Sequence, residues 1–261
     1  MDLALKGKRA LVAGASAGLG AACAESLAAE GCELVICARR EEELYARAES
    51  IQQNTGIRPF CVVGDLGTPE GIESLGDSIA NLPIDILVSN AGGPPPGRFL
   101  DHDPQAFPDA NRLVLDLAIG LTRLVLGSMV ERGWGRLIYI TSIGVLQPVD
   151  DLILSNTYRA GVTGFCKTIS NTYASSGVTA NCVCPGYTAT ERLDRLAQNR
   201  AEAIKSTPDE ILKQFASIVP AQRLGRPEEL ASLVTFLASD RAAYITGSSI
   251  AVDGGANRAL I

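Results

Sequence analysis

The residues best suited to chemistry near the N-terminus are the glycines of Gly14-Ala15-Ser16-Ala17-Gly18-Leu19-Gly20, a G-x-x-x-G-x-G run. This run follows a short apolar segment and precedes an alanine-rich segment with a helical composition. Glycines allow a tight turn and close approach to a pyrophosphate, which the free N–H groups and the dipole of a helix N-terminus attract. The run therefore predicts a dinucleotide site contacted by Gly14, Ser16, Ala17, Gly18 and Leu19. A purely structural tight turn is the alternative.

A second candidate binding position lies about twenty residues further on, at Cys37-Ala38-Arg39-Arg40. An NAD site would place an acidic residue here on the ribose 2′-hydroxyl, but neither Asp nor Glu is present. Arg39 and Arg40 could instead pair with a 2′-phosphate through charge-assisted hydrogen bonds. We therefore expect NADP(H) to be preferred over NAD(H). The alternative is that both arginines are solvated at the start of a charged helix.

The elements that must position these residues alternate between two patterns. The expected strands are apolar and rich in β-branched residues, at 9–13, 33–37, 60–63, 84–88, 136–140, 178–183 and 249–252. The expected helices are amphipathic, at 20–30, 41–53, 69–81, about 108–132, about 155–175 and 227–238. Apolar strands between amphipathic helices predict an α/β fold, a single Rossmann-type doubly wound parallel sheet with helices on both faces. We expect residues 1–261 to form one NAD(P)-binding domain.

Composition excludes several other classes of protein. The chain has 261 residues, of which 46% are hydrophobic and 20% charged, with a net charge of −6. Disorder is excluded, and we expect no membrane span because no uninterrupted apolar stretch approaches roughly 18 residues. The acidic balance, with no basic cluster, indicates no nucleic-acid partner. The first residues lack the apolar core of a signal peptide, so we expect a cytoplasmic protein.

The cysteines do not predict a metal site. There are seven, an odd number, and most stand in apolar runs, as reduced thiols used as small hydrophobic side chains do. Only Cys182 and Cys184 are close in sequence, and His102 is the single histidine. These residues provide no four-ligand zinc set with the usual spacing, so we expect no metal.

Further segments complete a resemblance to a known family. They are Asp65-Leu66, Ser89-Asn90-Ala91-Gly92, Pro185-Gly186-Tyr187-Thr188-Ala189-Thr190, Arg223 to Glu229, Tyr244 to Gly247 and Val252 to Gly255. With the glycine loop they make essentially the whole chain resemble a short-chain dehydrogenase/reductase. The resemblance implies that the cofactor contacts Asp65, Leu66, Asn90, Ala91, Gly92, Pro185, Gly186, Thr188 and Thr190. It also implies a homotetramer or homodimer and a small-molecule substrate.

The catalytic part of that resemblance is altered. The family uses Asn, Ser, Tyr and Lys, with the lysine four residues after the tyrosine. Ser142 fits the serine, and alignment of Arg159-Ala160-Gly161-Val162 with the usual K-A-A-V places Arg159 at the lysine and Ser155 at the tyrosine. Tyr158 is followed four residues later by Val162, so no Y-x-x-x-K remains. Tyr158 also lies about 100° around a helix from Arg159.

The asparagine of the family is also replaced. Its position falls on Val114, and Asn111, one helical turn earlier, could substitute only by reaching further.

This combination predicts an oxyanion site without a strong proton donor. Arg159 can hold the cofactor ribose and stabilise negative charge on a substrate oxygen, with hydrogen bonds from Ser142 and Ser155. A serine hydroxyl is a far weaker acid than a tyrosine phenol paired with lysine. The first interpretation is hydride transfer to or from a small carbonyl or hydroxyl compound. Conjugate C=C reduction, in which solvent later protonates an enolate, and a catalytically silent NADP(H)-binding protein are the alternatives.

The segment at about 191–219 corresponds to the substrate lid of the family. It carries four basic side chains: Arg192, Arg195, Arg200 and Lys205. They could bind an acidic substrate or form the solvated face of an amphipathic helix, and the pattern favours the solvated face.

Three further features lie around the expected pocket. The proline-rich loop Gly93 to Arg98 is expected to wall the pocket opposite the lid. His102 is expected in a helix-entry loop rather than as a catalytic base. Tyr187 stands inside the motif Pro185 to Thr190, so it is the one phenol expected near the nicotinamide. It is a candidate proton donor in place of the family's tyrosine.

Overall fold

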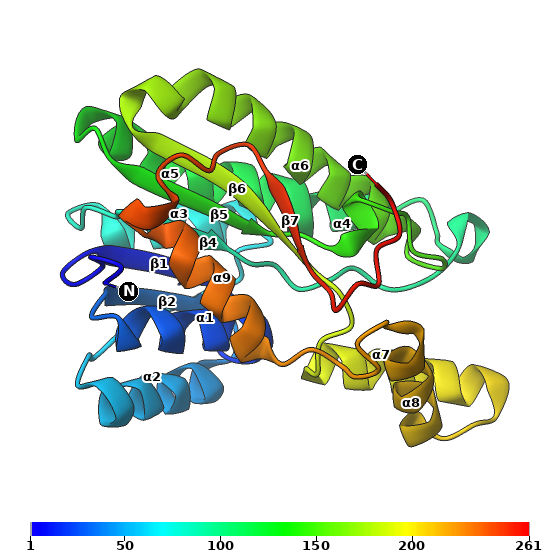
Figure 1. Ribbon diagram of the computed structural model, residues 1–261. Coiled ribbons are helices and arrows are strands. Elements are labelled where there is room, and N and C mark those ends of the chain that lie inside the picture. The colour runs from blue at the N-terminus through cyan, green and yellow to red at the C-terminus, as the bar shows by residue number, and fades with distance from the viewer. Residues whose placement is uncertain (1, 261) are drawn as a thin grey trace.

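Seven parallel strands form one sheet in the computed structural model, which describes residues 2–260 (Figure 1). The strand order is β3-β2-β1-β4-β5-β6-β7, and every neighbouring pair is parallel. The strands are β1 (Arg9–Ala13), β2 (Glu33–Ala38), β3 (Phe60–Val63), β4 (Ile86–Ser89), β5 (Gly135–Ile140), β6 (Val178–Pro185) and β7 (Ser249–Val252). The order reverses between β1 and β4, which opens a crevice at the carboxyl ends of the strands. The predicted doubly wound fold is confirmed.

Helices cover both faces of the sheet (Figure 1). One face packs against α1 (Gly18–Ala29), α2 (Glu41–Thr55) and α9 (Pro227–Ala238), and the other against α3 (Pro69–Ile79), α5 (Leu117–Glu131) and α6 (Ile153–Tyr173). Side chains of β1 alternate between the two cores, with Val12 in the first and Leu11 in the second. Because both faces are buried, the strands are apolar at most positions rather than at every second one, with buried polar exceptions such as Arg136 in β5 and Asn181 in β6.

The remaining helices are short or lie away from the sheet. They are α4 (Ala106–Asn111), α7 (Glu191–Ile204), α8 (Pro208–Ile218), the π-helix η2 (Arg112–Asp116) and the 3-10 turns η1 (Phe99–Asp101), η3 (Ile143–Val145), η4 (Ala174–Ser176) and η5 (Asp240–Ala242).

The single helix expected over about 108–132 is a run of α4, η2 and α5. The π turn at its centre holds an extra residue, and the side chain of Asn111 reaches Asp116, five positions later, with 2.8 Å between Nδ2 and Oδ2. This run, Ala106–Glu131, is long and apolar enough to cross a membrane by length and composition, since an 18-residue window within it has a mean hydropathy of 1.8. Its buried residues, including Leu121 and Val125, belong to the core beneath the sheet. Composition alone was therefore too weak to exclude a membrane span here, and packing assigns the run to the core.

The segment expected to form a lid folds as a helical hairpin. Helices α7 and α8 project from the body of the protein below the sheet in Figure 1. They share a small apolar cluster that includes Leu193, Ala197, Ile211 and Phe215. A capping box between Thr207 and Glu210 begins α8. The hairpin therefore has its own packing.

The seven cysteines are free thiols. Burial raises the pKa of Cys23, Cys32 and Cys37 to about 12. Within residues 2–260, no group of three or more His, Cys, Asp or Glu side chains is arranged to hold a metal ion.

Candidate active site

A cavity of about 510 Å³ lies at the carboxyl ends of the strands. Every residue that the sequence proposed for cofactor binding or catalysis lines it: Gly14, Ser16, Ala17, Gly18, Leu19, Arg39, Arg40, Asp65, Leu66, Asn90, Ala91, Gly92, Ser142, Ser155, Arg159, Pro185, Gly186, Thr188 and Thr190. These residues come from segments far apart in the chain, and the sheet brings them to one edge.

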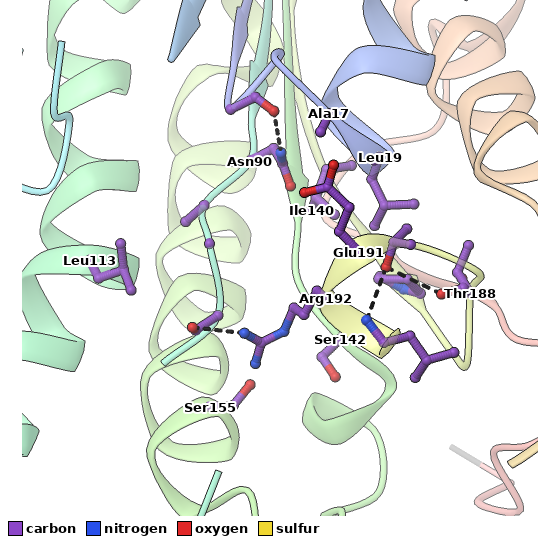
Figure 2. A pocket seen from close by; sticks show the side chains of 18 of the residues that line it. Ala17, Leu19, Asn90, Leu113, Ile140, Ser142, Ser155, Thr188, Glu191 and Arg192 are labelled. Carbon is purple, nitrogen blue, oxygen red and sulfur yellow. Dashed lines mark hydrogen bonds between the residues drawn. The ribbon is translucent and has the colours of Figure 1, made fainter. Parts of the chain in front are cut away.

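The glycine loop is fixed against the end of β4. Gly14 has φ +63°, a conformation that favours glycine, and a Cβ there would lie 2.7 Å from Asn90 Nδ2. Asn90 Nδ2 donates hydrogen bonds to the main-chain oxygens of Ala13, at 3.3 Å, and Gly14, at 3.4 Å (Figure 2). The loop therefore needs glycine both for its backbone conformation and for contact with Asn90.

The N-terminus of α1 is open toward this loop. Its N-cap residue, Ala17, has no side chain that could cap the helix, and the first turn contains no acidic residue. The first N–H groups of the helix and its positive dipole are therefore available for an anion. This arrangement fits the pyrophosphate of a dinucleotide.

Arg39 and Arg40 lie at the end of β2, on the rim of the cavity. Arg39 Nη1 is 3.4 Å from Asp65 Oδ2, and Arg40 Nη1 is 3.2 Å from Glu191 Oε2. Exposed ion pairs of this kind contribute about 0–1 kcal/mol, so a phosphate could displace either carboxylate.

Arg159 lies at the inner end of the cavity. The side chain leaves α6 and is 7% exposed. Nη1 donates a 2.9 Å hydrogen bond to the main-chain oxygen of Ile140, and Nη2 is 3.5 Å from that of Ala91. Burial, with Arg192 nearby, lowers the pKa of Arg159 to about 10, so the guanidinium is protonated at neutral pH.

Two serines line the same cavity as this guanidinium. Ser142 follows β5 and its Oγ accepts a 3.0 Å hydrogen bond from Gly144 N, which leaves its hydroxyl proton free to be donated. Ser155 is buried one helical turn before Arg159, on the same face of α6. Both side chains face the cavity in Figure 2, which shows no hydrogen bond from Ser155 to the other residues drawn.

One lid residue was interpreted wrongly from the sequence. Arg192 is not on a solvated face: it is half-buried in the cavity wall, and its guanidinium donates to the main-chain oxygens of Gly93, at 2.8 Å, and Pro94, at 3.2 Å (Figure 2). Arg195 also lines the cavity, although it is exposed. Arg200 and Lys205 are exposed and lie outside the cavity lining, as the amphipathic pattern indicated.

The phenols and the histidine take different positions. Tyr158 packs against the core and is not part of the cavity lining. Tyr187 lines the cavity, where its ring stacks on Phe215 at 5.0 Å and burial raises its pKa. His102 follows η1 and lies edge-on to Phe107 at 6.4 Å, away from the cavity lining.

The position of the family's asparagine is apolar. Val114 is buried in the core within η2. Asn111 is hydrogen-bonded to Asp116 and does not line the cavity, so it does not replace the missing amide.

Sequence motifs missed the apolar wall of the cavity. Leu113, Leu117, Val149 and Leu152 line the substrate end of the cavity, and no motif identifies them. Of the proline-rich loop Gly93 to Arg98, which was expected to wall the pocket, Gly93 lines it and the other five residues do not. That part of the loop is tied to the segment before α6 through a bridge between Gly97 and Leu152.

Comparison with known proteins agrees with this geometry. Residues 14–257 match the family model described as enoyl-(acyl carrier protein) reductase. The chain is 34% identical to 3-oxoacyl-[acyl-carrier-protein] reductase FabG of Aquifex aeolicus, over 98% of this chain and 99% of that protein. It is 32% identical to acetoacetyl-CoA reductase of Rhizobium meliloti, over 94% and 97% of the two chains.

A solved structure is similar over its full length. L-sorbose reductase from Gluconobacter frateurii, complexed with NADPH and L-sorbose, has a TM-score of 0.94 and 32% identity, with 100% of both chains covered. Motifs, strand order, cavity and relatives all agree. The chain belongs to the short-chain dehydrogenase/reductase family and is an NAD(P)H-dependent oxidoreductase.

Proposed function

We propose that the protein is an NADP(H)-dependent reductase that transfers hydride to the carbonyl carbon of a small molecule and catalyses the reverse oxidation at the same site. The observation that carries this proposal is the buried guanidinium of Arg159, which lines one cavity together with Ser142 and Ser155. NADPH, when bound, supplies the hydride.

Arg159 would stabilise the oxygen that becomes negative as hydride reaches the carbonyl carbon. Its two known hydrogen bonds go to main-chain oxygens, so other N–H groups of the guanidinium remain for ligands. A fixed positive charge in a partly desolvated cavity stabilises a developing oxyanion without reorganisation of water. Arg159 would also hold the ribose of the cofactor, as the lysine of the family does.

Ser142 and Ser155 would donate hydrogen bonds to the same oxygen. The Ser142 hydroxyl is oriented by Gly144 N, and Ser155 is held by the helix that carries Arg159. The product alcohol needs a proton on that oxygen. We propose that Ser142 passes it from water, with Tyr187 as the second candidate donor because it lines the cavity.

The cofactor is proposed to be NADP(H) in preference to NAD(H). Arg39 and Arg40 lie at the position where an acidic residue would hold the ribose hydroxyls in an NAD site. The L-sorbose reductase relative has been solved with NADPH, which supports the same preference.

Conjugate reduction of a C=C bond is the second candidate function. It is favoured by one observation: Tyr158, the phenol nearest in sequence to the family's tyrosine, is partly buried against the core and does not line the cavity. Hydride addition to the β-carbon of an unsaturated carbonyl compound produces an enolate, which Arg159 and the two serines could stabilise and water could protonate. The description of the matching family model as an enoyl reductase is consistent with this chemistry.

Assembly and location are also proposals. We propose a cytoplasmic homotetramer or homodimer built on α5 and α6, since the exposed face of α5 carries apolar side chains such as Ile119, 37% exposed.

The experiment that tests this function locates the transferred hydride. Purified protein is incubated with NADPH deuterated at the 4-pro-S position and with a panel of oxo compounds and α,β-unsaturated ketones and thioesters. Deuterium on the carbinol carbon is the expected result. Deuterium on the β-carbon would show that the protein catalyses conjugate reduction instead of carbonyl reduction. Label in neither place, with NADPH bound, would favour a catalytically silent cofactor-binding protein.

A further inference from the structure

The guanidinium of Arg192 is held in a fixed position in the cavity wall by the main-chain oxygens of Gly93 and Pro94, which together form its seat. Arg192 lies in the first turn of α7, and its Nη1 and Nη2 donate to the main-chain oxygens of Gly93 and Pro94. A main-chain oxygen holds a guanidinium in place without neutralising it. The side chain is therefore fixed and half-buried, and it keeps its full charge.

Gly93 makes this seat possible. A Cβ built on Gly93 would lie 1.9 Å from Arg192 Cζ and 2.0 Å from Nη2. Any larger residue at position 93 would therefore push the guanidinium out of its position. The loop therefore contacts the lid where Gly93 packs against the guanidinium of Arg192.

The charges around the cavity are unbalanced at this end. The two acidic residues of the lining, Asp65 and Glu191, pair with Arg39 and Arg40 at the cofactor end. Within residues 2–260 no carboxylate forms an ion pair with Arg159, Arg192 or Arg195, which are the basic residues of the remaining lining.

The bound cofactor would not remove this imbalance. Its anionic groups belong at the N-terminus of α1 and beside Arg39, whereas the guanidinium of Arg192 points toward Ser142 and Ser155 and away from Ala17 (Figure 2). The proximity of Arg192 contributes to the lowered pKa of Arg159, and Arg195 contributes to the lowered pKa of Arg192. Positive groups this close are stabilised by an anion between them.

We propose that the substrate is a small oxo acid whose carboxylate is bound by Arg192 while its carbonyl group faces Arg159, Ser142 and Ser155. This inference rests on the proposed carbonyl reduction and names its substrate class. A planar guanidinium matches a carboxylate through two parallel hydrogen bonds. The walls formed by Leu113, Leu117, Val149 and Leu152 would contact the hydrocarbon part of such a molecule. Arg192 is thus a specificity-determining residue.

The test compares acids with neutral molecules of the same shape. Several 2-oxo and 3-oxo acids are assayed with NADPH, each beside its primary amide, and the binding of both to the NADP⁺-saturated protein is measured by calorimetry. A hydroxyketone phosphate is included as a phosphate probe. The variants are Arg192→Gln, which removes the charge, Gly93→Ala, which removes the seat and keeps the arginine, and Lys213→Gln, which removes an exposed lid charge outside the cavity.

We expect the wild-type protein to prefer the acid to its amide. Arg192→Gln should raise KM and the dissociation constant for the acid by about 10- to 100-fold, the effect of losing a charge-assisted pair, with less than about threefold change for the amide. Gly93→Ala should change both values in the same direction, and Lys213→Gln should change neither.

The outcomes separate this inference from the proposed function. If amides are reduced as well as acids and Arg192→Gln changes neither, the carboxylate site is overturned while carbonyl reduction stands. If acids bind through Arg192 but are not reduced, the site stands and carbonyl reduction fails. If the acids neither bind nor react, the carboxylate site is overturned, and an Arg192-dependent preference for the phosphate alone has the same meaning. Carbonyl reduction is overturned as well only if no acid, amide or phosphate of the panel is reduced.

Discussion

Arg159 Nη1 donates a 2.9 Å hydrogen bond to the main-chain oxygen of Ile140, the last residue of β5. This bond joins α6 to the strand that ends beside Ser142, so the charge and the serine hydroxyl are held by one rigid connection. A buried arginine held by main-chain oxygens rather than by a carboxylate keeps its charge for a ligand. The geometry therefore makes Arg159 the centre of the proposed chemistry.

The first prediction concerns the pH dependence of the reaction. Burial lowers the pKa of Arg159 to about 10, and only the protonated guanidinium stabilises an oxyanion. Titration of Arg159 should therefore leave the rate of hydride transfer unchanged at pH values well below 10. The rate should fall as pH rises through about 10. Stopped-flow measurement of NADPH oxidation, with circular dichroism at each pH to confirm folding, checks this.

Arg159→Lys provides the matched variant for that profile. A lysine has an ordinary pKa of about 10.4, and burial at the same position should lower it further. The alkaline limb should consequently move to lower pH. An alkaline limb at the same pH in both proteins would assign the titration to another group.

A second prediction concerns the glycine loop. Gly14→Ala should abolish measurable NADPH binding, because the backbone there has φ +63° and a Cβ would lie 2.7 Å from Asn90 Nδ2. Fluorescence titration of NADPH checks this. Gly127→Ala is the control, since a Cβ at that exposed position in α5 meets nothing within 4 Å and alanine favours a helix. Equal affinity of Gly14→Ala and wild type would refute the loop as the dinucleotide site.

A third prediction concerns the choice of cofactor. Arg39→Ala should weaken NADPH binding by about 10-fold or more, the effect of losing a charge-assisted bond to a phosphate, and should leave NADH within about threefold. Separate titrations of the two cofactors give both values, so NADH serves as the internal control. A wild-type protein that binds both cofactors equally would contradict the role assigned to Arg39.

A fourth prediction concerns the nearest phenol. Tyr158→Phe should leave the rate of hydride transfer within about threefold of wild type, because Tyr158 packs against the core and does not line the cavity. A loss of about 100-fold, with the protein still folded, would mean that this phenol reaches the substrate after all.

Much of the fold follows from the sequence because a parallel sheet is buried on both faces. Most strands, such as Leu34 to Ala38, are largely apolar runs, and the intervening helices carry one apolar face. Most of the residues proposed for cofactor binding could also be identified from the sequence, since they stand in short contiguous motifs at or directly after the ends of strands, whereas Arg159 lies within α6.

The parts that sequence did not predict depend on contacts between distant segments. The burial of Arg192 requires the seat at Gly93, 99 positions away, and the periodicity of an amphipathic helix contains no information about such a contact. The π turn that brings Asn111 to Asp116 also has no recognisable sequence signal. Hydropathy could not show that the run Ala106–Glu131 lies against a sheet.

The most direct test of the central claim measures hydride transfer in Arg159→Ala beside wild type, in single turnovers at saturating NADPH, with the best oxo substrate of the panel. Removal of a charged oxyanion donor should slow hydride transfer by about 100- to 1,000-fold. NADPH affinity, which depends mainly on the glycine loop, should fall by less than about tenfold. A rate of hydride transfer in Arg159→Ala equal to that of wild type, or a wild-type protein that binds NADPH and reduces no oxo compound, would contradict the account.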